Sequence, residues 1–270
     1  MSNNNKFQEF KNVNRIWAVG SLHSSIESFQ SIKDYILKNF TKADKLIFLG
    51  NIIGFRNKSK EIISEVLKLR FDLMANFNLD HEDVVFLRGA QEEMFSKLLQ
   101  LQIAPNPKEI IDWIFSHGVD QTVTSYNLDP EQFRNTASQG TIQINKLTSK
   151  LNQKISMNPG HKEFFSNLKH AAYSESKELL FVNRGVDLSR PLSAQNDCFW
   201  WGYHNFSSIN APYGSFKRIV RGYQSNKNND LENSKNKILC TLFKQPLKDR
   251  RVLAGIFSKK GEIIELFESN

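Results

Sequence analysis

The chain has 270 residues, of which 40% are hydrophobic and 24% are charged, close to the composition of an average soluble globular protein. This composition excludes disorder along the whole chain, and two cysteines, Cys198 and Cys240, are too few for a disulfide framework. No apolar run approaches the roughly 18 residues of a transmembrane helix, and the polar start MSNNNKFQEFKN lacks the apolar region of a secretory signal. We therefore expect a cytoplasmic protein with no membrane partner.

The formal net charge is +8, which allows a polyanionic partner. The basic residues form only short clusters, at 58–60, 217–221 and 248–251, and no block of like charges. Nucleic-acid binding would require these clusters to converge on one face together with aromatic side chains. A solvated basic surface is the simpler interpretation, and polyanion binding stays open as an alternative.

Three apolar runs in the first third of the chain end in glycine and predict buried strands, and a stretch with helical spacing follows each of them. Ser24 or Ser25 is an expected N-cap of the first helix. This βαβαβα order indicates a central sheet with flanking helices. Residues 1–12 are polar and are expected to form an N-terminal tail. The strands are expected at residues 15–20, 45–50 and 83–89, and the helices at about 26–37, 59–71 and 91–101.

The middle of the chain, about residues 103–170, combines helical patches with a Pro105/Pro107 pair and a polar stretch, which predicts a helical insertion into the α/β body. Residues 225–237 are rich in Asn and Lys and predict an exposed loop. We expect a single domain over residues 13–270 that contains this insertion. Strands resume after it at 179–182, 218–222, 237–241, 251–257 and 262–267, and the last two form a predicted hairpin.

Ligands of open α/β sheets bind outside the carboxyl ends of the strands, so the loops after these strands form the expected site. Their sequences are VGSLHS, LGNIIGFR, LRGAQEE, FVNRGVD and VRGYQ. In order and spacing they resemble the five motifs of the calcineurin-like metallophosphoesterases, most closely the bacterial serine/threonine protein phosphatases and diadenosine tetraphosphate hydrolases. The resemblance covers about residues 15–268. It implies an α/β fold of the metallophosphoesterase type, a β-sandwich flanked by helices, with a helical cap insertion.

In the resembled family, the motifs hold two divalent ions about 3.5–4 Å apart, which clamp a phosphate and activate a hydroxide. A histidine of the third motif protonates the leaving group, and an aspartate of the second motif orients it. In this chain those two positions are Gln91 and Gly54. The metal-ligand positions of the family fall on Ser21, His23, Asn51, Ala90, Asn183 and Tyr223.

Only His23 keeps a ligand of the family's type, and one imidazole is far short of the ligands that a divalent ion requires. Gln91 has no proton to donate near neutral pH, so it cannot act as the acid. His204 or Asp187 could compensate as ligands. We expect instead that the di-metal site is lost, that no cofactor is bound, and that the protein is a pseudoenzyme. A divergent, weakly active metal-dependent phosphoesterase and a structural subunit of a larger assembly are the alternatives.

Four arginines lie in or beside these motifs: Arg56, Arg88, Arg184 and Arg221. Their charge, together with the loss of carboxylates at 21, 51 and 54, makes this region more positive. Guanidinium groups bind phosphate bidentately without a metal, so these residues are candidates for an anion site that binds a phosphorylated ligand or a protein partner. The alternative is that these four arginine side chains point to solvent and bind no ligand.

Other residues near the motifs have simpler structural interpretations. We expect His23 to be buried and hydrogen-bonded, and Glu92 to cap the helix that follows the third strand. Tyr223 is expected to fill the emptied metal cavity. Trp200 and Trp201 are expected to pack in the core, with a partner-facing patch as the alternative.

Overall fold

The computed structural model describes residues 6–202, 209–223, 237–244 and 251–270. Ten strands and nine α-helices are assigned within these ranges. The strands are β1 (Phe7–Phe10), β2 (Arg15–Val19), β3 (Lys45–Phe48), β4 (Val84–Phe86), β5 (Ala171–Ser174), β6 (Leu179–Val182), β7 (Arg218–Arg221), β8 (Leu239–Thr241), β9 (Leu253–Ser258) and β10 (Ile263–Glu268). The helices are α1 (Ile26–Asn39), α2 (Ser59–Phe77), α3 (Ala90–Leu99), α4 (Pro107–Ser116), α5 (Val119–Ser125), α6 (Pro130–Thr136), α7 (Thr141–Ser156), α8 (His161–Ser166) and α9 (Cys198–Trp201).

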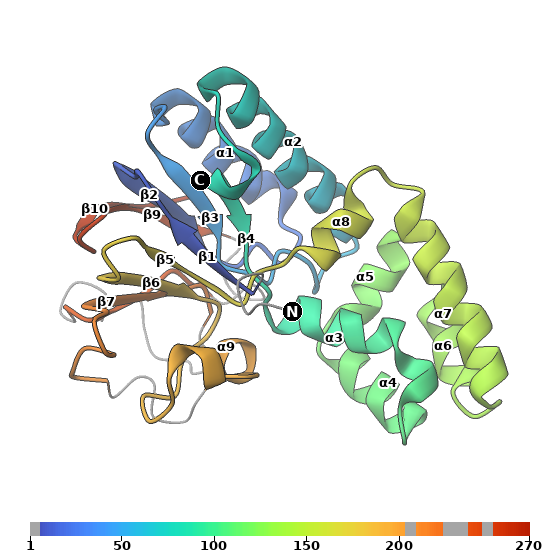
Figure 1. The fold of residues 1–270 in the computed structure, drawn as a ribbon. Helices are drawn as coiled ribbons and strands as arrows, with labels where there is room; N and C mark the ends of the chain where they lie inside the picture. Colours follow the sequence, from blue (N-terminus) through green and yellow to red (C-terminus); the bar gives the residue numbers. More distant parts are fainter. Residues whose placement is uncertain (1–5, 203–208, 224–236, 245–250) are drawn as a thin grey trace.

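The strands form two five-stranded sheets, in the orders β10-β9-β2-β3-β4 and β1-β5-β6-β7-β8. The pairs β2–β3, β3–β4, β6–β7 and β7–β8 are parallel, so their carboxyl ends lie at common edges. Helices α1 and α2 cover the sheet that contains β2 and β3, and α9 lies beside the other sheet (Figure 1). The expected α/β architecture, two sheets flanked by helices, is therefore confirmed.

Alternation of buried side chains along β2 explains the layering. Trp17 and Val19 face the core beneath the helices, while Ile16 and Ala18 face the core between the two sheets. Successive side chains of a strand point to opposite faces, so a strand buried on both faces is a continuous apolar run. This is why the sequence signal of β2 was clear.

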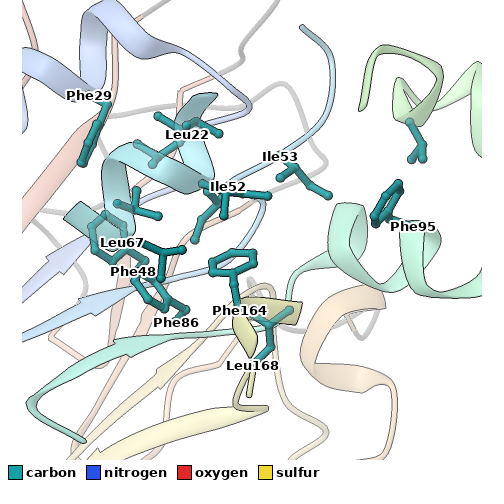
Figure 2. Packing of buried hydrophobic residues seen from close by; sticks show 14 of the residues in the cluster. Leu22, Phe29, Phe48, Ile52, Ile53, Leu67, Phe86, Phe95, Phe164 and Leu168 are labelled. Carbon is teal, nitrogen blue, oxygen red and sulfur yellow. The ribbon is translucent and has the colours of Figure 1, made fainter. Parts of the chain in front are cut away.

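The core beneath the helices extends into the loop that follows β3. Figure 2 shows Ile52 next to Leu22, with Ile53 on the side toward Phe95, and both isoleucines are fully buried. The second motif is therefore anchored by its own apolar side chains. This anchoring also fixes the positions of the polar groups around the motif.

Helices α4 to α8 lie within the range expected for the helical insertion, and α4 to α7 are grouped on one side of the sheets (Figure 1). No helix in the described ranges is long and apolar enough to cross a membrane. The expected loop at 225–237 lies outside the described residues, apart from Lys237.

The expected tail at residues 1–12 is wrong for Phe7–Phe10, which form β1 in parallel register with β5. Phe10 is 1% exposed, and its ring lies 6.5 Å from that of Phe181 in the core between the sheets. Two phenylalanines in a four-residue strand of otherwise polar composition gave too weak a local pattern. Tertiary packing supplies the stabilisation that the sequence pattern did not reveal.

Candidate functional site

Loops from both sheets are joined by backbone hydrogen bonds at the carboxyl ends of the strands. The carbonyl of Asn51 accepts from the amides of Leu22 and His23, at 3.1 and 2.9 Å. The carbonyl of Gly222 accepts from Ser21 at 3.2 Å, and its amide donates to Asn183 at 2.9 Å. Four of the five motifs are thus linked into one backbone network, and the residues predicted from them do come together.

The buried carboxylate of Glu92 connects the loop after β3 to the start of α3. One oxygen accepts from the amides of Asn51 and Gly89, both at 2.9 Å. The other accepts from Ile52 at 2.8 Å and Ile53 at 3.2 Å. Burial raises the pKa of Glu92, and backbone hydrogen bonds, among them those from Ile53, Asn51 and Gly89, act in the opposite direction. All strong acceptor positions of this carboxylate are therefore used in holding the loops together.

Neutral groups occupy the other predicted ligand positions, and the side chains of Ser21, Asn51 and Asn183 bond to one another or to the backbone. Ser21 donates through Oγ to the Gly222 carbonyl at 2.7 Å, and Asn51 donates through Nδ2 to Ser21 Oγ at 3.3 Å. The backbone N–H of Gln91 donates to Asn51 Oδ1 at 3.0 Å, and Asn183 Nδ2 donates to the Leu49 carbonyl at 2.7 Å. These side chains form a neutral hydrogen-bond network.

Gln91 fills the space beside Gly54. A Cβ atom at Gly54 would lie 2.0 Å from Gln91 Oε1, and Gly54 has a φ of +92°. Gln91 Nε2 donates to the His117 carbonyl at 2.8 Å, which fixes the orientation of the amide. Ala90, at the first position of α3, contributes only a methyl group. The side chain of Gln91 therefore occupies the space that the absence of a Cβ atom at Gly54 leaves open.

His23 is 1% exposed and is surrounded by aromatic rings. Its ring centroid lies 4.9 Å from that of Phe55, 6.1 Å from that of Tyr223 and 6.5 Å from that of Phe243. Neither ring nitrogen has a hydrogen-bond partner of good geometry among the described residues. The pKa of His23 is lowered to about 3, first by burial and then by the charge of Arg56, while the backbone of Ile53 acts in the opposite direction. The expectation of a buried His23 is correct, but the hydrogen bond expected for it is not found.

Phe243 is a member of this aromatic group that the sequence analysis missed. Its ring lies 4.6 Å from that of Tyr223. It follows β8, the last parallel strand of its sheet, so its place just beyond the carboxyl end of a predicted strand was the signal that could have identified it.

The four candidate arginines have different partners. Arg56 donates to the His23 carbonyl at 2.9 Å, and Arg221 donates to Thr241 Oγ1 at 2.8 Å. Arg88 pairs with Glu93 at 2.9 Å, and its guanidinium carbon lies 5.9 Å from the centre of the Trp200 ring. Arg184 lies over Tyr223, with its guanidinium carbon 5.5 Å from the ring centre. Arg56 and Arg184 therefore lie on either side of the His23–Tyr223 contact.

These residues do not fit a two-metal centre. The part of the chain that the structure describes contains no group of three or more His, Cys, Asp or Glu side chains able to hold a metal. Asp187, considered as a compensating ligand, accepts from Ser189 through Oδ1 and pairs with Arg190 through Oδ2. His204, the other such candidate, lies outside the described residues. Nothing in this donor set provides a carboxylate bridge between two cations.

Solved structures share this architecture. A protein assigned as a diadenosine tetraphosphatase is similar over 98% of this chain and 98% of its own, with a TM-score of 0.53 and 14% sequence identity. A cold-active protein-tyrosine phosphatase of a psychrophilic Shewanella species is similar over 98% of this chain and 82% of its own, with a TM-score of 0.50 and 11% identity. A metallophosphoesterase from Sphaerobacter thermophilus also matches, with a TM-score of 0.48 and 13% identity, over 96% of this chain and 89% of its own.

The chain has the metallophosphoesterase fold. The resemblance predicted from the motifs is confirmed for the fold. No protein-family model and no curated protein matches the sequence. At identities this low, the likeness describes the metallophosphoesterase fold and leaves the chemistry to the residues of this chain.

We predict that Glu92→Gln lowers the free energy of unfolding by about 3 kcal/mol, because the side-chain amide would face two backbone donors and leave them unbonded. Urea denaturation at neutral pH measures the loss. Glu163→Gln is the matched control, since Glu163 is an exposed glutamate in the first turn of α8. Equal stability of the two variants would contradict the role assigned to Glu92.

We also predict that His23 makes the protein acid-sensitive. Its pKa in the folded state, about 3, lies below the ordinary value of 6.5, so between these values the unfolded chain binds a proton that the folded chain does not. Stability therefore falls as the pH falls below about 6.5. His23→Asn removes this titration, and asparagine tolerates the φ of 45° at this position.

Between about pH 7 and pH 5, the parent protein should lose about 2 kcal/mol more stability than His23→Asn. Urea titrations of both proteins at the two pH values give this difference. The same pH dependence in parent and variant would show that His23 gains a proton partner in the folded state.

Proposed function

We propose that the chain is a catalytically inactive phosphatase-like protein that acts by binding a protein partner or a phosphorylated ligand. The observation that carries the proposal is the neutral network at the predicted metal-ligand positions. Ser21, Asn51 and Asn183 each donate their side-chain hydrogen to a protein oxygen atom. Hard divalent cations in proteins prefer carboxylate-rich oxygen sites, which this network does not provide.

The position of the catalytic acid supports the same conclusion. The amide of Gln91 donates to a backbone carbonyl and has no ionisable proton, so it cannot protonate a leaving group. Glu92, a carboxylate close to these positions, has its four hydrogen bonds directed to backbone amides. Among the described residues at these positions, none is placed to activate a hydroxide or to act as the acid.

A binding role is supported by how rigidly the loops are held. The loop after β3 is anchored by Ile52 and Ile53, and it is bonded to the loops after β2 and β4. Loops fixed on a scaffold in this way are suited to recognition, because little conformational entropy is lost when a ligand binds. The arginines beside them favour an anionic ligand.

The test combines metal analysis with an activity assay on the purified full chain. We expect no stoichiometric Mn, Fe or Zn, and no hydrolysis of p-nitrophenyl phosphate with added Mn²⁺. Melting temperatures measured with and without Mn²⁺ should coincide. Two bound metals per chain, or turnover that His23→Ala abolishes, would overturn the proposal in favour of a divergent phosphoesterase.

Restoring one carboxylate should not restore a metal site. We predict that Asn51→Asp destabilises the protein by about 1–2 kcal/mol, because the Asn51 hydrogen bond to Ser21 is lost and a charge enters a buried position. Added Mn²⁺ should not reverse this loss. Thermal unfolding of Asn51→Asp is compared with that of Asn145→Asp, an exposed control on α7. A rise in the melting temperature of Asn51→Asp alone on adding Mn²⁺ would mean that enough ligands remain.

A further inference from the structure

Arg184 is held in a defined position beside the neutral network. It follows β6, and its backbone amide donates to the Phe199 carbonyl of α9 at 2.8 Å. The side chain runs between Tyr223 and Gly202. A Cβ atom at Gly202 would lie 2.9 Å from Arg184 Nε and 3.0 Å from Cγ and Cδ, so the glycine makes the space for the stem.

The guanidinium of Arg184 is half-buried, and no described residue forms an ion pair or a side-chain hydrogen bond with it. In contrast, Arg88 and Arg190 each have a carboxylate partner, Glu93 and Asp187 respectively. Burial lowers the pKa of Arg184, which reflects the cost of keeping its charge partly out of water. A positioned, partly desolvated cation without a counter-charge favours the binding of an anion.

The surroundings favour an oxyanion over a cation or an apolar group. The guanidinium of Arg184 lies over the ring of Tyr223, and that ring contacts His23. The charge of Arg56 also acts on His23. Two cations, Arg184 and Arg56, therefore contact this aromatic group, and a doubly charged phosphate would gain more from them than a singly charged carboxylate.

We propose that Arg184, supported by Tyr223 and Gly202, is the anchor of a phosphate-binding site that lies beside the predicted metal positions and needs no metal. This inference rests on the proposed binding function and specifies its ligand. Arginine binds phosphate with two parallel hydrogen bonds, and its planar group can stack on an aromatic ring at the same time. Tyr223 therefore orients the guanidinium of Arg184, and the guanidinium N–H groups bind the phosphate oxygens.

Calorimetric titration of the full chain with inorganic phosphate, adenosine monophosphate and a phosphoserine peptide tests the site, with acetate as the carboxylate comparison. The parent should bind the phosphate-bearing probes, and the tightest of them identifies the source of the phosphate. Arg184→Gln should weaken their binding at least tenfold, the loss expected for one charge-assisted contact. Arg190→Gln is the control, an exposed arginine with its own carboxylate partner, and should bind as the parent does.

Stability supplies a second measurement that separates binding from folding. Because Arg184 has no counter-charge among the described residues, Arg184→Gln should melt at or above the temperature of the parent in phosphate-free buffer. Phosphate should then raise the melting temperature of the parent and of Arg190→Gln, and leave that of Arg184→Gln unchanged.

Three results would overturn this site: no binding of any phosphate probe by the parent, equal affinity of the parent and Arg184→Gln, or acetate binding as tight as that of phosphate. These outcomes are distinguishable from a failure of the proposed function. A metal-free, inactive protein without phosphate affinity would still be a binding protein, whereas metal-dependent turnover would remove the proposed function whatever Arg184 does.

Discussion

The hydrogen bonds of one buried carboxylate fix the geometry of the site. Glu92 accepts from four backbone amides, three in the loop after β3 and one at the start of α3. A buried carboxylate is tolerated only when donors surround it, and here the donors are main-chain groups that no side-chain substitution removes. The loop after β3 and helix α3 consequently keep their relative position without a metal ion between them. The same bonds withdraw Glu92 from any role as a ligand.

The neutral residues are packed against one another. An aspartate at Gly54 would have to adopt a φ of +92° and would displace the side chain of Gln91, whose Oε1 lies 2.0 Å from the Cβ position. A Cβ at Gly89 would lie 2.4 Å from both the amide nitrogen and Oδ1 of Asn51. Each residue of the network has a neighbour shaped around it, and tightly packed interiors tolerate new volume poorly. The neutral arrangement is a packed structure in its own right.

Features of the fold and the site that depend on neighbouring residues could be predicted from the sequence, whereas features that depend on residues far apart in the chain could not. The strands that end in Gly20, Gly50 and Gly89 were evident, because burial on both faces leaves a continuous apolar run. The position of the site followed from the motifs. Strand β1 was missed, since Phe10 is stabilised by Phe181, far away in the sequence. Side-chain direction was equally inaccessible: that Arg88 pairs with Glu93 while Arg184 lies on Tyr223 depends on rotamers and on distant loops.

The electrostatics connect the neutral network to the proposed ligand. Where the resembled family has aspartates, this chain has Ser21, Asn51 and Gly54, and the charge that remains nearby is mostly that of arginines. A site with carboxylates requires cations before it can accept a phosphate, because like charges repel at short range. A site without them can accept the phosphate directly. In the proposed site, the positive charge that meets the anion therefore belongs to the chain itself, on Arg184, which has no counter-charge among the described residues.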